Sequence, residues 1–181
     1  MKNNFKILVL CIIATLNFSY VNAQKCKFDY EKKDPFTGKP SKGNTSAIYP
    51  ASPISSEYWY LGLNKMGDEF YIGMLLQLNG ELNTYLEKGD SIMFKLSNNE
   101  VVTCYAKERS SLTSNVYVAG NQPVLTSQYR SHYDIPTDKL RLFTENLVTY
   151  IRMNVGDKVY QREIKEKHAK KLMKNSTCII N

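Results

Sequence analysis

The chain has 181 residues, with 24 lysines and arginines against 17 aspartates and glutamates and a formal net charge of +7. This length is enough for one domain with a proper core, and the sequence has no apolar run of the roughly 20 residues that a membrane-spanning helix needs. The positive balance points only weakly to anionic partners, because a solvated lysine-rich surface is the simpler explanation.

The first 23 residues have the pattern of a secretory signal peptide. Two lysines precede an apolar run from Ile7 to Leu16, and compact residues at Val21–Ala23 place the expected cleavage after Ala23. The apolar run has about ten residues, too few for a membrane anchor. The residues before Cys11 and Cys26 are too large for lipoprotein processing. We therefore expect a secreted or periplasmic protein without a transmembrane anchor.

Cleavage would leave Cys26, Cys104 and Cys178 in the mature chain. An oxidising compartment favours one disulfide, and the odd count leaves one thiol free or engaged with another chain. Of the three pairings we favour Cys26–Cys178, which would tie the two ends together and close a loop of about 150 residues. Cys104 lies in an expected strand, where a free cysteine usually behaves as a small hydrophobic residue.

Turn residues punctuate the segment from Gln24 to Pro53. Cys26–Tyr30 has the alternation of a short edge strand, and Asp34–Gly38 has the composition of a turn. Lys39–Pro53 combines prolines and glycine with serines and asparagine. It is expected to be a long loop, which is either a connector or a functional segment.

The central strands are expected at Tyr58–Leu63 and Phe70–Leu78. The second run is apolar on both faces, which is typical of a strand in the middle of a covered sheet. Trp59 shares a face with Leu61 and Leu63 and is expected in the core. Outward-facing tyrosines beside it define a candidate binding face for a protein or glycan. The residues of this candidate face are Tyr58, Trp59, Tyr60 and Tyr71. Ordinary strand composition is the competing explanation.

A β-hairpin is predicted at Gly89–Ala106, where Ile92, Phe94 and Leu96 alternate with other residues and Asn98-Asn99 supplies a turn. Its register stays open, because a one-residue slip exchanges the two faces of the second strand. A two-residue turn would place Val101, Thr103 and Tyr105 opposite the apolar residues of the first strand. The slip would instead bring Val102, Cys104 and Ala106 to the core.

Two helices and a further hairpin are expected in the last third of the chain. Pro136 begins a helix with a buried stripe of Leu140, Phe143 and Leu147. Leu147–Val155 and Lys158–Ile164 flank a Gly-Asp turn and predict a hairpin. A final helix is expected from Glu163 to Asn175.

Lysines cover much of this final helix and are a candidate contact for an anionic surface. They are Lys165, Lys167, Lys170, Lys171 and Lys174. Solvation of the helix is the simpler explanation, and the aromatic residues typical of platforms for single-stranded nucleic acids are missing from this pattern.

No catalytic, cofactor or metal site is predicted. His132 and His168 are the only histidines, and neither has the local partner spacing of a zinc site. Ser131-His132-Tyr133-Asp134 has the residue types of a hydrolytic triad, but neighbours on a strand point to opposite faces and do not converge. A secreted hydrolase that uses His132 or His168 is therefore an alternative function rather than the leading one.

Four segments together resemble small uncharacterised secreted proteins of Bacteroidetes-type bacteria. They are Asp34–Gly38, Glu87–Asp90, Asn99–Thr103 and Glu163–Lys171. The resemblance implies export from such a bacterium, and it implies no activity.

The sequence thus predicts a single α+β domain over residues 24–181, with an antiparallel, meander-rich sheet of about six to eight strands and two helices in the C-terminal third. The leading function is an exported non-enzymatic binding or accessory protein of the bacterial envelope or secretome, acting through an exposed sheet face or the Lys39–Pro53 loop. A structural subunit of an envelope assembly is a further alternative, and it predicts an unpaired hydrophobic sheet edge.

Overall fold

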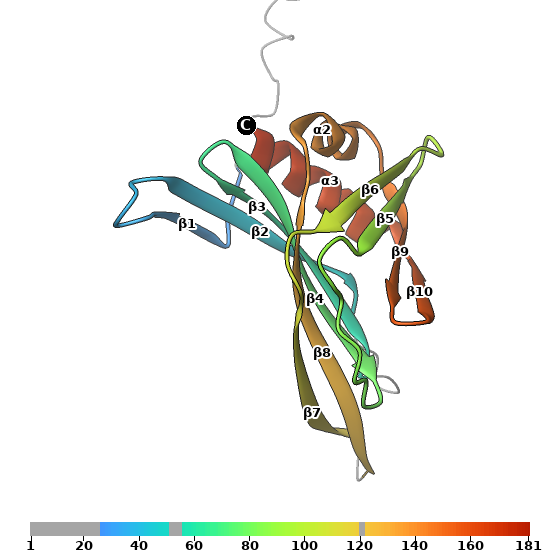
Figure 1. The fold of residues 1–181 in the computed structure, drawn as a ribbon. Helices are drawn as coiled ribbons and strands as arrows, with labels where there is room; N and C mark the ends of the chain where they lie inside the picture. The colour runs from blue at the N-terminus through green and yellow to red at the C-terminus, as the bar shows by residue number, and fades with distance from the viewer. Residues whose placement is uncertain (1–25, 51–55, 120–121) are drawn as a thin grey trace, which may run out of the picture.

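One antiparallel sheet of ten strands and two helices near the C-terminus form the fold in a computed structural model, which describes residues 26–50, 56–119 and 122–181 (Figure 1). The elements are β1 (Tyr30–Lys33), β2 (Pro40–Tyr49), β3 (Tyr58–Met66), β4 (Glu69–Asn79), β5 (Ser91–Leu96), β6 (Val101–Ala106), β7 (Ser111–Ala119), β8 (Gln122–Asp134), α2 (Thr137–Glu145), β9 (Val148–Val155), β10 (Lys158–Glu163) and α3 (Glu166–Ile180). The strand order in space is β1-β2-β3-β4-β8-β6-β5-β9-β10, with β7 beside β8. The antiparallel sheet and the C-terminal helices are confirmed, and the expected signal peptide lies outside the described residues.

The predicted hairpin of β5 and β6 is present, and its register is the slipped one. Phe94 lies opposite Val102, and Ile92 lies opposite Cys104, so the alternating apolar residues of both strands are buried together. The turn is wider than two residues, since Asn99 adopts a φ of 69° and its N–H donates to the Leu96 carbonyl. Burial of the apolar face thus sets the register here.

Pro40–Tyr49 is strand β2, so the expectation of a loop at Lys39–Pro53 is wrong over most of its length. The strand pairs with β1 and β3. Its inward residues include Ser46, whose Oγ accepts a hydrogen bond from Asn175 Nδ2 of α3 at 2.9 Å. Ser46 can occupy this buried position because a polar side chain of the helix meets it. Residues 51–53 lie outside the described residues.

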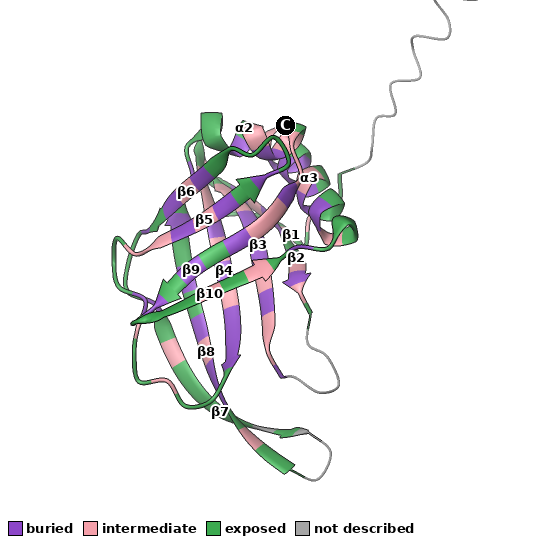
Figure 2. Ribbon diagram, turned by 90° about the vertical axis from the view of Figure 1, so that its right-hand side faces the viewer, coloured by how far each residue is buried: buried purple, intermediate pink, exposed green. Residues whose placement is uncertain are grey.

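The sheet curls so that its two ends approach each other, and α3 lies in the space between them. The helix contacts β2 and β3 near one end of the strand order and β9 near the other. Figure 2 shows β9 and β10 in front of β3 and β4, with buried positions along β9, β3 and β4. Ala169, Leu172 and Ile179 form the buried stripe of α3. The fold is therefore a curled sheet whose C-terminal helix packs against strands from both of its ends.

Both helices differ slightly from the expected boundaries. α2 begins after Pro136 and buries Leu140 and Phe143 as predicted, but it ends at Glu145, so Leu147 lies beyond it. α3 begins at Glu166 and continues to Ile180, because Cys178 and Ile179 extend its buried stripe past the predicted end. The predicted hairpin of β9 and β10 is confirmed.

Four side chains, called here the clasp, join β10 to the far end of the sheet: Tyr49, Glu57, Trp59 and Arg162. Arg162 of β10 donates from Nε to Glu57 Oε1 at 2.8 Å and from Nη2 to Oε2 at 2.7 Å. Trp59 Nε1 donates to the same carboxylate at 2.8 Å, and the guanidinium lies over the rings of Tyr49 and Trp59. Within the described residues no strand pairing connects β10 to β2 or β3. Side chains therefore hold this side of the curl together.

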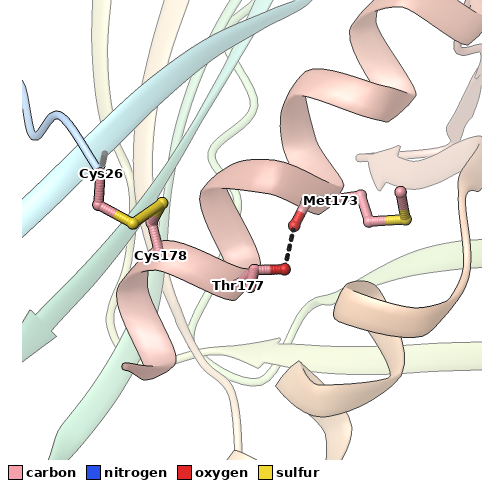
Figure 3. The surroundings of a disulfide bond; sticks show 4 residues. All are labelled: Cys26, Met173, Thr177 and Cys178. Atoms are coloured by element: carbon pink, nitrogen blue, oxygen red, sulfur yellow. Dashed lines mark hydrogen bonds between the residues drawn. A yellow bond between two sulfur atoms is a disulfide. The ribbon is translucent and has the colours of Figure 1, made fainter. Parts of the chain in front are cut away.

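The favoured cysteine pairing is present in the structure. Cys26, just before β1, forms a disulfide with Cys178 in the last turns of α3, across a sequence separation of 152 residues (Figure 3). Thr177 Oγ1 donates to the Met173 carbonyl at 3.1 Å in the same turn of the helix. The bond links the start of the described chain to α3, and it is consistent with an oxidising compartment.

Cys104 is free and buried on β6. Burial raises the pKa of its thiol to about 12. We expect the native protein to react with iodoacetamide at Cys104 much more slowly than an unfolded control, because burial blocks access to the thiol and disfavours the reactive thiolate. Mass spectrometry of labelled peptides measures this rate with and without urea. Equal rates in both conditions would contradict the buried position of the thiol.

Candidate binding face

The side of β3, β4 and β8 that points away from α3 carries a group of aromatic and polar residues, called here the outer face. Its members come from aligned positions of the three strands. They are Tyr58, Tyr60, Asn64, Tyr71, Leu75, Gln128, Arg130 and His132. Three of the four residues of the predicted face, Tyr58, Tyr60 and Tyr71, are among them, and all three are half-buried.

Trp59, the fourth residue, points the other way. Its side chain is fully buried in the core beside Leu61, on the face that the alternation of the strand predicts. Its indole donates to Glu57 in the clasp. The structure therefore places Trp59 in the core and the clasp rather than on the outer face.

One cluster of the outer face is centred on Tyr58 and Tyr60. Their rings meet edge to face with centroids 5.3 Å apart, and Gln128 Nε2 of β8 donates to Tyr58 Oη at 2.6 Å. Leu75 lies opposite Tyr60 on β4, and Arg130 lies opposite Leu75 on β8. These contacts hold the two tyrosine rings in place, with an apolar residue and an exposed guanidinium next to them in the register.

A second cluster joins β1 to the same face. Tyr30 Oη donates to Asn64 Oδ1 at 3.0 Å and lies 3.3 Å from Tyr71 Oη. Burial raises the pKa of Tyr30, and the hydrogen bond to Tyr71 adds to the effect. The Tyr71 ring in turn contacts the His132 ring edge to face at 5.9 Å. Long-range contacts thus bring Tyr30, Tyr71 and His132 together from three different strands.

Two glycines separate the clusters. Gly62 of β3 lies directly opposite Gly73 of β4, and the Asn64 side chain bends over them, with its Nδ2 donating to the Gly62 carbonyl at 3.2 Å. The sequence indicates a close approach at these glycines, and the approaching group is the Asn64 amide. The outer face is consequently low in its middle and raised on both sides by tyrosines.

Gly43 of β2 allows Tyr30 and Asn64 to lie across the strand. A Cβ at this position would stand 2.6 Å from Tyr30 Cε1 and even closer to Asn64. We expect Gly43→Ala to lower the free energy of unfolding by about 1–3 kcal/mol, because both side chains must move. Urea denaturation measures the change. Gly73→Ala is the control, since its Cβ would meet Asn64 Nδ2 at 3.3 Å and His132 Cδ2 at 3.9 Å, both at the ends of side chains and neither as close as the contacts at Gly43. An equal loss in both variants would contradict this account.

A hollow of about 300 Å³ adjoins the second cluster. Its lining combines tyrosines with three lysines of the β1–β2 hairpin, and the residues include Tyr30, Tyr71, Lys32, Lys33, Lys39, Met66 and Asp34. Hydrogen bonds from the Thr37 and Phe36 N–H groups and the Thr37 hydroxyl occupy Asp34 and lower the pKa of its carboxyl. The three ammonium groups therefore give this end of the outer face a positive balance.

The triad-like sequence on β8 does not converge. His132 and Asp134 point outward, whereas Ser131 points inward and its Oγ donates to Tyr133 Oη at 3.3 Å. His132 Nδ1 lies 3.2 Å from Glu108 Oε1, and both side chains are largely exposed. Asp134 instead pairs with Lys107 at 3.3 Å.

His168 and the lysines of α3 lie away from the outer face. Lys170 pairs with Glu166 at 2.6 Å, and Lys171 donates to the Thr45 carbonyl at 3.4 Å. All five lysines of the predicted anionic contact are exposed: Lys165, Lys167, Lys170, Lys171 and Lys174. They form a basic helix surface, with one lysine already paired to an acid.

Two further features bear on the kind of site. Among the described residues, no group of three or more histidine, cysteine, aspartate or glutamate side chains is arranged to hold a metal ion. No helix in residues 26–50, 56–119 and 122–181 has both the length and the apolar character to cross a membrane.

The chain matches no protein-family model, no curated protein and no solved structure.

Proposed function

We propose that the protein is an exported, non-enzymatic binding protein of the bacterial envelope or secretome, and that its outer face binds a protein partner. The observation that carries the proposal is the pair of tyrosine clusters on either side of Gly62 and Gly73. Tyrosine and arginine are enriched in protein interfaces, and both occur on this face. The predicted signal peptide and the Cys26–Cys178 bond support export.

The arrangement of the side chains favours binding without a large entropic penalty. Tyr58, Tyr71 and Tyr30 are each held by a side-chain hydrogen bond or ring contact before any ligand arrives. Ordered aromatic side chains lose little rotamer freedom on association. The hollow beside Tyr30 adds lysine ammonium groups, so the partner is expected to combine an apolar patch with an acidic one.

Site-specific photo-cross-linking in the native host tests the proposal. Tyr60 is replaced by a photoreactive phenylalanine analogue, and Tyr150 of β9, another half-buried tyrosine, is the matched control position. A protein adduct at position 60 that is missing at position 150 supports the outer face. Adducts at both positions or at neither overturn it, and a glycan adduct at position 60 alone would replace the partner class.

A second candidate function, a structural subunit of an envelope assembly, is favoured by a separate observation. Three of the exposed large hydrophobic residues lie on the hairpin of β7 and β8: Val116, Val118 and Leu125. The hydrolase alternative has no such support, because Ser131 and His132 point to opposite faces of the sheet.

A further inference from the structure

The hairpin of β7 and β8 extends beyond the rest of the sheet. β4 pairs with β8 only up to Thr126, which lies opposite Asn79, and one further backbone hydrogen bond joins Gly80 to Leu125. Beyond that point β8 is paired with β7 alone. Figure 1 shows these two strands reaching farthest from the helices. We call residues 116–119 and 122–125 the arm.

The face of β7 and β8 that is buried in the core continues along the arm, where it becomes exposed. Tyr129 is fully buried and lies opposite Leu112, which packs against the core. Two residues farther along, Ser127 is still covered, and its Oγ bonds to the Gly80 carbonyl and the Leu82 N–H. The next aligned positions are open. Val116 and Val118 are each 63% exposed, and Leu125 is 49% exposed.

The free edge of β7 is also unusual in its chemistry. Residues 111–119 contain no charged residue, no proline and no glycine, and their register with β8 is unbroken. Natural sheet edges are normally protected by charges, prolines or bulges. The other two edge strands follow that rule, since β1 carries Glu31, Lys32 and Lys33 and β10 carries Lys158, Arg162 and Glu163.

We propose that β7 pairs with β7 of a second copy of this chain, antiparallel and related by a two-fold axis. This inference rests on the assembly role, the second candidate function, and not on the outer face. An uncharged strand can face its own copy in any register without placing like charges opposite each other, whereas some registers of β10 do place them so, such as Lys158 opposite Arg162. The unpaired N–H and C=O groups of both copies would then complete one continuous sheet.

In a continuous sheet, the inner faces of the two copies lie on the same side only if each inner residue of one β7 is opposite an inner residue of the other β7. A register centred on Asn115 meets this condition. It places Leu112 opposite Val118 of the second copy and Ser114 opposite Val116 of the second copy. The exposed apolar residues of the two arms then lie side by side on one face, and the area that they bury against each other stabilises the pair.

Sedimentation equilibrium of the mature protein over a range of concentrations tests the pairing. We expect a reversible dimer, and we expect Val116→Lys to weaken its dissociation constant by at least about tenfold, because two copies of the lysine would lie on that same face. Val159→Lys is the matched control, since Val159 is 65% exposed on the charged edge strand β10. A wild-type protein that stays monomeric, or equal weakening by both variants, overturns the proposal.

A cysteine scan tests the register. Asn115→Cys would face itself across the two-fold axis, where opposed Cα atoms lie about 4.5–5.5 Å apart, within the range of a disulfide. We expect rapid oxidation to a covalent dimer at position 115 and slow oxidation for Thr113→Cys. Native gels of host envelope fractions report the assembly role separately. If the purified wild type is monomeric but the Val116→Lys variant loses a large complex in these fractions, self-pairing is overturned and the assembly role is retained.

Discussion

Replacing Arg162 by alanine is expected to lower the free energy of unfolding by about 3 kcal/mol or more. The guanidinium makes two hydrogen bonds to Glu57 and covers the rings of Tyr49 and Trp59. The side chains of Arg162 and Glu57 are only 27% and 13% exposed. Removal of the cation would take two charge-assisted hydrogen bonds away from a poorly solvated carboxylate. It would also release the contact between β10 and the far end of the sheet.

Urea denaturation of Arg162→Ala and Arg152→Ala makes the measurement specific. Arg152 also donates two hydrogen bonds, from Nε and Nη2 to Gln161 Oε1, but this pair lies on the exposed surface of β9 and β10. We expect a loss of well under 1 kcal/mol for Arg152→Ala. Similar losses in the two variants would show that the clasp does not hold the curl together.

Removal of the disulfide is expected to have a comparable or larger effect. The double variant Cys26→Ser, Cys178→Ser should lose about 3–5 kcal/mol, because the bond closes a loop of more than 150 residues and restricts the unfolded chain. It should also loosen α3, which contacts both ends of the sheet. Urea denaturation with helix content followed by circular dichroism reports both effects.

Wild-type protein treated with reductant serves as the control for the serine substitutions. It should match the double variant in stability, and reductant should leave the double variant unchanged. A double variant as stable as the oxidised wild type would mean that packing of α3 alone fixes the helix.

The strands with regular alternation could be predicted from the sequence. β5 has apolar residues at every second position, and these are the residues that the structure buries. The hairpin of β9 and β10 was equally readable, because a Gly-Asp turn separates two β-prone runs. In both cases the local pattern and the burial agree.

β2 could not be predicted because two of its inner positions, Asn44 and Ser46, are polar. Ser46 is buried against Asn175, a residue 129 positions away, and this partner is not visible in the local sequence. Gly43 reads as a turn residue but lies beneath Tyr30 and Asn64. The register of β6 was open for a related reason, since Val101 and Val102 are equally suited to a strand face and only the tertiary burial decides between them.

The candidate face was predictable in part. Alternation places Tyr58 and Tyr60 on one side of β3 and Trp59 on the other, as the core position of Trp59 confirms. The contributions of Tyr30 and His132 could not be found, because they depend on the pairing of β1 with β2 and of β4 with β8. Pairings between distant strands leave no periodic signal in a single sequence.

The clasp joins residues far apart in sequence, with 105 positions between Glu57 and Arg162. A contact of this separation forms late, because a long loop must close before it contributes. We therefore expect it to be largely missing from the folding transition state and to act mainly on the rate of unfolding. Loss of the clasp should accelerate unfolding far more than it slows refolding, so the clasp would chiefly extend the lifetime of the folded protein.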